Sequence, residues 1–128
     1  MYQVGTAIQF PAKHIMPGVE GPEGELHAHD YRIEVVVERE ELDDRGMVCD
    51  LDVLDAALAA TADHVRDENL EKIRPPGAEA VTVEVFARWA HGAVAQALVP
   101  TGAETLTVRV WESPVAYGGY RAGIASRG

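Results

Sequence analysis

Three histidines of this chain have the spacing of a metal site. His27 and His29 stand two residues apart at the start of a strand-like run. Side chains at positions i and i+2 of a strand point the same way, so both imidazoles can converge on one point. His14 lies upstream, just past another strand-like run. Three neutral imidazoles with an open fourth position are a recurrent catalytic zinc set. The alternative is that these are ordinary surface or hydrogen-bonded core histidines.

The segments that must position these histidines alternate between apolar and polar residues. Residues 2–10 and 31–38 each show this alternation, which is typical of half-buried strands. Pro11 is expected to end regular pairing of the first strand. Residues 16–24 contain two prolines and three glycines, which predicts a loop between the candidate ligands. Functional residues often lie on such loops.

The rest of the chain predicts two helices and further strands. Leucines at helical spacing predict a helix from about 51 to about 62, and Asp50 or Asp52 can cap its start. Thr82 can cap a second helix, which ends before Pro100; His91 is expected on its solvated side. Further strands are expected at 47–49, at 105–112 and, as a short tail strand, at 117–120. This order predicts an α+β fold with a four-stranded antiparallel sheet and two helices on one face.

Length and composition limit the class of protein. Residues 1–128 suit one domain with a single core. The formal net charge of −10 argues against binding to nucleic acid, and no apolar run is long enough for a membrane span. The N-terminus shows no leader, and the single Cys49 suits a reducing compartment, so we expect a cytoplasmic protein. Open sheet edges favour a homo-oligomer.

Six short motifs occur in the order and spacing of a known family. They are Phe10-x-Ala12-x-His14, Leu26-His27-Ala28-His29-Asp30-Tyr31, Gly46-Met47-Val48-x-Asp50, Asp63-His64, Thr82-x-Glu84 and Val110-x-Glu112. In these motifs, and over nearly its whole length, the chain resembles the 6-pyruvoyl-tetrahydropterin synthase and 6-carboxy-tetrahydropterin synthase (QueD-like) family. The resemblance implies the tunnelling fold. In that fold the sheets of neighbouring subunits join into a barrel, usually in a hexamer, with active sites between subunits.

The resemblance also implies catalytic and metal-binding residues. It assigns zinc to His14, His27 and His29. Asp63 and His64 match the family's Asp–His pair, in which the carboxylate orients and charges the imidazole.

The resemblance further implies how the pterin ring is held. Glu112 matches the glutamate that binds the ring, since a carboxylate can accept two hydrogen bonds from the ring's guanidine-like edge. Thr82 lies at the helix start that frames the pterin pocket.

One departure from the family concerns the catalytic cysteine. The family places this cysteine four residues before the first histidine of the pair, and here that residue is Glu23. Cys49 is expected to be a buried apolar filler and no substitute. A glutamate can act as general base if burial raises its pKa. We therefore expect Glu23 to replace the cysteine, although Glu23 and Glu25 as solvated loop carboxylates are the alternative.

These features lead to three hypotheses of different classes. The first is a zinc-dependent lyase that acts on the side chain of dihydroneopterin triphosphate or a close analogue. The second is a catalytically inactive pterin- or purine-binding protein. The third is a protein in which the zinc is structural and no small molecule is bound. Lys13, Arg66 and Arg121 are candidates to meet a triphosphate, but the low content of lysine and arginine counts against that substrate.

Overall fold

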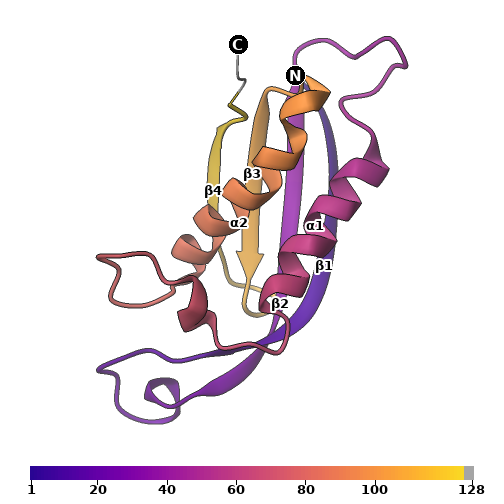
Figure 1. Cartoon of the computed structure of the whole chain (residues 1–128). Helices are drawn as coiled ribbons and strands as arrows, with labels where there is room; N and C mark the ends of the chain where they lie inside the picture. Colours follow the sequence, from indigo (N-terminus) through magenta and orange to yellow (C-terminus); the bar gives the residue numbers. More distant parts are fainter. Residues whose placement is uncertain (126–128) are drawn as a thin grey trace.

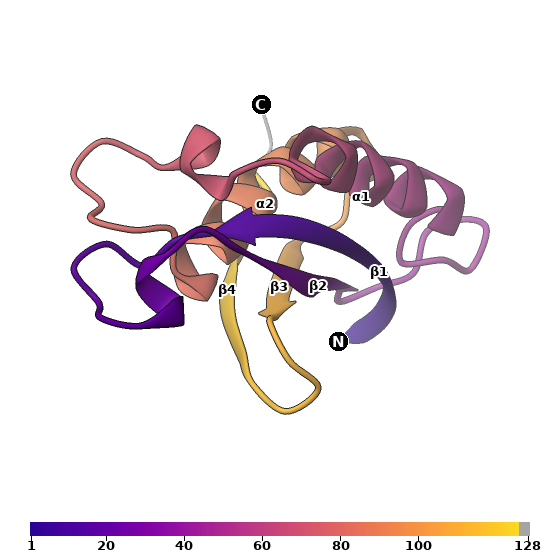
Figure 2. The same cartoon turned by 90° about the horizontal axis from the view of Figure 1, so that it is seen from below.

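One antiparallel sheet carries both long helices on the same face (Figures 1 and 2). The computed structural model describes residues 1–125, with every side chain among them except that of Glu23. The strands lie side by side in chain order, β1-β2-β3-β4. The elements are β1 Tyr2–His14, η1 Pro22–Gly24, β2 His27–Arg39, α1 Leu51–Val65, η2 Leu70–Ile73, α2 Val83–Leu98, η3 Val99–Thr101, β3 Thr105–Trp111 and β4 Tyr117–Gly123. The predicted α+β class and four-stranded sheet are confirmed.

The core lies between the sheet and the helices. Alternate residues of each strand point to the helices, as the period of two requires. The sheet buries Ile33, Val35, Val37, Leu106, Val108 and Val110, and the helices cover them with Leu54, Leu58, Phe86, Val94 and Leu98. No described helix has the length and apolar character that a bilayer crossing requires.

The helix starts are fixed by the expected capping residues. Asp50 accepts a hydrogen bond from the Asp52 backbone N–H at the start of α1. The Thr82 hydroxyl accepts one from the Val85 N–H at the start of α2. Each cap satisfies a backbone donor that the helix itself cannot pair. Helix α1 runs to Val65, three residues beyond the predicted end.

Two strand predictions need correction. Strand β1 continues through Pro11 to His14, with Pro11 opposite Asp30. This is possible because β1 is an edge strand, where a missing N–H need not break the ladder. Residues 47–49 form no strand. Asp43 organises a turn there by accepting hydrogen bonds from the Arg45 and Met47 N–H groups, and the fourth strand is β4.

The expected solvation of His91 is wrong. This side chain is buried beneath β4, edge-on to Tyr120, with its Nε2 3.3 Å from the Ala122 carbonyl oxygen. Strand β4 covers a face of α2 that the helix pattern alone marks as polar.

The sheet face opposite the helices carries paired charges. Arg109 donates to Glu34 at 3.0 Å, and Arg121 donates to Glu38 at 3.3 Å. Gln3 also donates to Glu38, at 3.3 Å. The pKa of Glu38 lies below its ordinary value of 4.5, chiefly because of the Gln3 hydrogen bond and then because of Arg121.

Candidate metal centre and its cavity

The register of β1 and β2 brings the three histidines together. His14 is directly opposite His27, and Ala12 is opposite His29. His27 and His29 share the helix-facing side of β2, and His14 has the same orientation on β1. The site therefore lies where the β1–β2 ladder ends, close to the start of α2 (Figure 1).

The ring nitrogens lie at distances that a single ion can bridge. One ligand atom from each histidine lies within 4.8 Å of the other two. The Nε2 atoms of His27 and His29 are 2.9 Å apart. The Nδ1 of His27 lies 2.6 Å from the Glu25 carbonyl oxygen, which can only accept, so Nδ1 donates this hydrogen bond and Nε2 is the ring nitrogen that faces His29. A hydrogen bond from the remote nitrogen to a carbonyl is typical of metal-binding histidine.

His14 gives the strongest indication that these residues fit a metal. Its side chain is 6% exposed, and neither ring nitrogen has a hydrogen-bond partner. The Val81 backbone lies near the ring, but it forms no hydrogen bond with either nitrogen. A buried, unpaired imidazole is costly unless something binds it. Burial lowers the pKa of His14 below 6.5, and the neighbouring His27 and His29 lower it further. The ring is thus held neutral, which is the form that binds metal.

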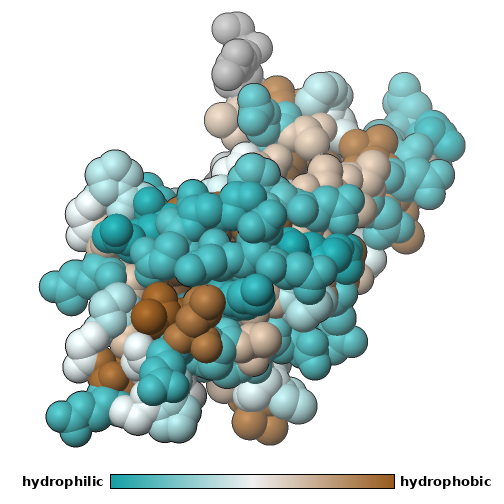
Figure 3. All heavy atoms as spheres, turned by 60° about the horizontal axis from the view of Figure 1, so that its bottom comes forward, coloured by the Kyte–Doolittle hydropathy of each residue, from teal (hydrophilic) through white to brown (hydrophobic). Residues whose placement is uncertain are grey.

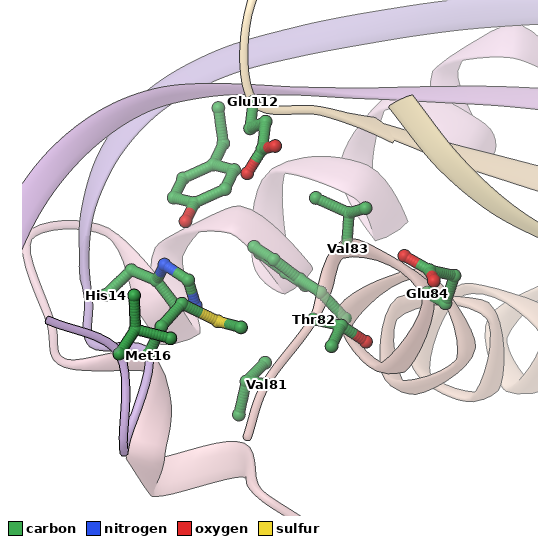
Figure 4. A pocket seen from close by; sticks show the side chains of 10 residues that line it. His14, Met16, Val81, Thr82, Val83, Glu84 and Glu112 are labelled. Atoms are coloured by element: carbon green, nitrogen blue, oxygen red, sulfur yellow. The ribbon is translucent and has the colours of Figure 1, made fainter. Parts of the chain in front are cut away.

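A cavity of about 370 Å³ lies beside the three imidazoles. Its wall combines apolar side chains with a few polar groups, as is typical of sites for small molecules. Figure 4 shows His14 on one side of the hollow, the carboxylate of Glu112 above it and that of Glu84 on the far side. The lining residues are His14, Met16, Val19, Tyr31, Val81, Thr82, Val83, Glu84, Phe86 and Glu112.

Two of the expected ligand-binding residues line this cavity. Glu112 follows β3 directly and keeps the helix-facing parity of Val110, so its carboxylate reaches the hollow. Thr82 lines the wall, but its hydroxyl is engaged in capping α2. Glu112 can therefore accept hydrogen bonds from a ligand, whereas Thr82 positions the helix.

The Asp63–His64 pair lies elsewhere in the chain. Both residues are exposed in the last turn of α1. Asp63 accepts from Arg66 at 3.2 Å, and the His64 ring stacks on Trp89 with centroids 5.6 Å apart. His64 lines a separate hollow between α1 and α2. Within one chain, neither residue lines the cavity beside the imidazoles.

Glu23 lies in η1, in the loop between β1 and β2, and its side chain is outside the described part of the structure.

Two polar residues that line the cavity, Tyr31 and Glu84, were not predicted from the sequence as part of the site. Tyr31 continues the parity of His27 and His29 along β2, and that parity is the signal that marks it.

Comparison with known proteins identifies the fold and the family of the chain. None of the curated proteins is significantly similar to the chain in sequence. The 6-pyruvoyl tetrahydropterin synthase of Caenorhabditis elegans has the same fold, with a TM-score of 0.73, 21% identity, and coverage of 94% of this chain and 95% of that one. A Plasmodium vivax 6-pyruvoyltetrahydropterin synthase with a catalytic glutamate replaced by alanine matches with a TM-score of 0.74 and 11% identity, over 96% and 99% of the two chains.

An uncharacterised protein of Wolinella succinogenes is also similar, with a TM-score of 0.70 and 18% identity over 93% of this chain and 97% of that one. At these identities the structural likeness establishes the fold. The sequence profile described as 6-pyruvoyl tetrahydropterin synthase matches residues 3–123, almost the whole chain. The chain therefore belongs to the 6-pyruvoyl tetrahydropterin synthase family.

Proposed function

We propose that this protein is a zinc-dependent lyase that acts on the side chain of dihydroneopterin triphosphate or a close analogue. The observation that carries the proposal is the pair of buried, unpaired nitrogens of His14, which face two further imidazoles beside a cavity. The membership of the chain in its family supports pterin chemistry of the lyase type. Zinc bound by the three histidines would act as a Lewis acid toward substrate oxygens.

The remaining roles follow from the residues themselves. Glu112 would accept hydrogen bonds from the amino and ring N–H groups of the pterin and so fix the ring beside the imidazoles. Thr82 would hold the start of α2 against the ring. Glu23 would remove a proton from the side chain as general base. A glutamate in a catalytic role has a parallel in the Plasmodium vivax enzyme, whose catalytic glutamate has been replaced by alanine.

Asp63 and His64 would act in the site of a neighbouring subunit. They are exposed and lie outside their own chain's cavity, as residues donated across an interface would be. We propose a homohexamer with sites between subunits, working in the cytoplasm. In that assembly His64 would transfer protons, and Asp63 would have to exchange its ion pair with Arg66 for one with His64.

The first experiment measures zinc content and product formation with a panel of reduced pterins. We expect Glu23→Ala to lower turnover by about 100-fold or more, with Glu25→Ala as the matched control from the same loop. Ligand binding without product in the wild type would favour the inactive pterin- or purine-binding homologue. Metal retained at saturating pterin, with an unchanged spectrum after cobalt substitution, would favour a structural zinc.

A second experiment tests whether sites lie between subunits. Glu23→Ala and His64→Ala are each expected to inactivate the homo-oligomer. Mixed oligomers of the two variants should regain part of the activity, because some sites then combine an intact Glu23 with an intact His64 from a different chain. Absence of complementation in proven mixed oligomers would contradict a shared site.

A further inference from the structure

The end of β1 that carries His14 is held along both of its edges. On one edge it pairs with β2, as far as His14 opposite His27. Residues 67–69, here called the strap, lie along the other edge, in the connection from α1 to η2 (Figures 1 and 2). Lys13 of β1 and Asn69 of the strap form a parallel bridge there. The strap therefore covers the edge of β1 next to the metal centre.

Two short backbone hydrogen bonds join the strap to β1. The Asp67 N–H donates to the Pro11 carbonyl oxygen at 2.8 Å. The Lys13 N–H donates to the Glu68 carbonyl oxygen, also at 2.8 Å. Alternate residues of an antiparallel ladder pair with the neighbouring strand, so Pro11 and Lys13 point these groups away from β2. The strap thus binds groups that β2 cannot reach, one and three residues before His14.

The strap is held by its backbone and by its two ends, and its own side chains are not buried. Residues 67–69 are exposed, at an end of the molecule whose surface is mostly hydrophilic with one compact hydrophobic patch (Figure 3). Val65 before the strap and Leu70 after it are buried in the core. The Glu68 N–H also donates to the Val65 carbonyl oxygen at 3.0 Å. The path of the strap is therefore fixed on both sides.

Asp67 has a backbone conformation that most residues avoid. Its φ is 60°, the one positive value among the described residues other than glycine. Glycine, asparagine and aspartate tolerate this left-handed region, whereas a β-branched side chain is strained there. From this turn the Asp67 N–H reaches Pro11, so the turn joins the end of α1 to the edge of β1.

The position of the His14 ring depends on the backbone that the strap holds. Neither ring nitrogen has a hydrogen-bond partner, so packing and the end of β1 set the place of the ring. A strand end that is paired on one edge alone frays more readily than one paired on both. Metal ligands must be held to within about 0.5 Å of their working geometry. A second paired edge therefore matters most at a residue such as His14.

We propose that the strap positions His14 for metal binding, with Asp67 as the positioning residue whose left-handed turn keeps the strap on β1. This inference rests on the zinc site of the proposed function. It adds a residue that is neither one of the three histidines nor part of the cavity wall. The strap follows Asp63 and His64 closely in the chain, so it also fixes the end of α1 relative to the metal centre of its own subunit.

The first test compares substitutions at position 67 in the full chain. Asp67→Val places a β-branched side chain in the left-handed region. We expect it to raise the Kd for zinc about tenfold or more and to change the visible spectrum of the cobalt-substituted protein. Asp67→Gly relieves the strain and keeps the N–H donor, so it should retain the wild-type Kd and spectrum.

Gly102→Val is the matched control for backbone strain. Gly102 has a φ of 80° in the turn after α2, beside the Arg39 side chain and away from the three histidines. The substitution should lower stability and leave the Kd for zinc and the cobalt spectrum unchanged. This control separates a loss of metal geometry from a loss of stability alone.

A second pair of variants removes one hydrogen bond between the strap and β1. Lys13→Pro deletes the N–H that donates to Glu68, and the β1–β2 ladder keeps its bonds because this N–H points away from β2. We expect it to weaken zinc binding about threefold or more. Lys13→Ala keeps the N–H and should leave zinc binding unchanged. If Asp67→Val does not fold, this pair decides the question.

The outcomes separate this inference from the proposed function. Wild-type zinc affinity and an unchanged cobalt spectrum in folded Asp67→Val or Lys13→Pro would overturn the inference and leave the proposed function standing. An equal loss of affinity in Gly102→Val would overturn it too, because lowered stability would then be the cause. If the wild-type protein does not bind zinc tightly, the proposed function is wrong and this inference is wrong with it.

Discussion

His14 and His27 form the last residue pair of the β1–β2 ladder, with their rings edge-on and their centroids 5.6 Å apart. The register thus fixes the three-histidine cluster, because a slip of one residue would send His14 and His27 to opposite faces of the sheet. His29 completes the set because it is two residues from His27 on the same face. Residues on paired strands are suited to hold metal ligands, which must be positioned with little freedom.

Removal of the His14 imidazole should abolish tight zinc binding. We expect His14→Ala to weaken zinc binding by about 100-fold or more, since one of three protein ligands is lost. Competition with a chromophoric chelator measures the Kd. His91→Gln is the matched control, because His91 is equally buried but contacts the Ala122 carbonyl. Wild-type affinity in His14→Ala, with a native circular dichroism spectrum, would contradict the three-histidine site.

Gly118 of β4 holds the start of α2 close to the sheet. A Cβ at this position would lie 2.6 Å from Val83 Cγ2 and 3.1 Å from the Glu84 N. We expect Gly118→Ala to lower the free energy of unfolding by about 1–3 kcal/mol, because overpacking forces the helix start to move. Pterin binding should weaken too, since residues 82–84 line the cavity.

Gly123→Ala is the control from the same strand, where the nearest atom to an added Cβ is the Glu104 oxygen at 3.8 Å. Chemical denaturation gives both free energies of unfolding. If the two variants lose equal stability, the close packing of β4 on the start of α2 does not explain why position 118 requires a glycine.

Local chemistry made much of the fold predictable from the sequence. Tyr31, Ile33 and Val35 alternate with polar residues, and this pattern predicts strand β2. The structure confirms the strand and buries all three side chains. Thr82 was predicted as a cap because its hydroxyl can satisfy the free N–H groups that follow it. The helix-facing parity that unites His27 and His29 is equally local. These features need no knowledge of distant contacts.

Features that depend on distant neighbours were not predictable. Whether Pro11 ends a strand depends on its position at the sheet edge, which the local pattern does not reveal. Residues 47–49 read as a strand, but the Asp43 carboxylate organises a turn instead. His91 reads as polar surface until β4 covers it. The place of Asp63 and His64 in a site depends on a second subunit, so it remains a prediction.

Cys49 should be chemically quiet and dispensable for activity. The side chain is 3% exposed, and burial, with a further contribution from Asp50, raises the pKa of the thiol above 9.0. The thiolate fraction near neutral pH is therefore small, and we expect Cys49 to react with a thiol reagent at least about ten times more slowly than a free thiol. Cys49→Ala should retain turnover. Rapid labelling in the native state, or loss of turnover in a folded Cys49→Ala protein, would restore the thiol as a candidate nucleophile or base.

Glu38 should make the stability of the fold depend on pH in the acidic range. The Gln3 hydrogen bond and Arg121 hold the pKa of Glu38 below 4.5 in the folded state. A depressed carboxyl pKa stabilises the fold above the unfolded-state value, and this contribution is lost as pH falls through the folded-state pKa. Denaturation curves at a series of pH values should thus show a steeper acid loss of stability for the wild type than for Glu38→Gln. The control Glu40→Gln removes an exposed carboxylate just beyond the end of β2 and should keep the wild-type slope. Parallel slopes for wild type and Glu38→Gln would mean that the contacts with Gln3 and Arg121 do not stabilise the charged form in solution.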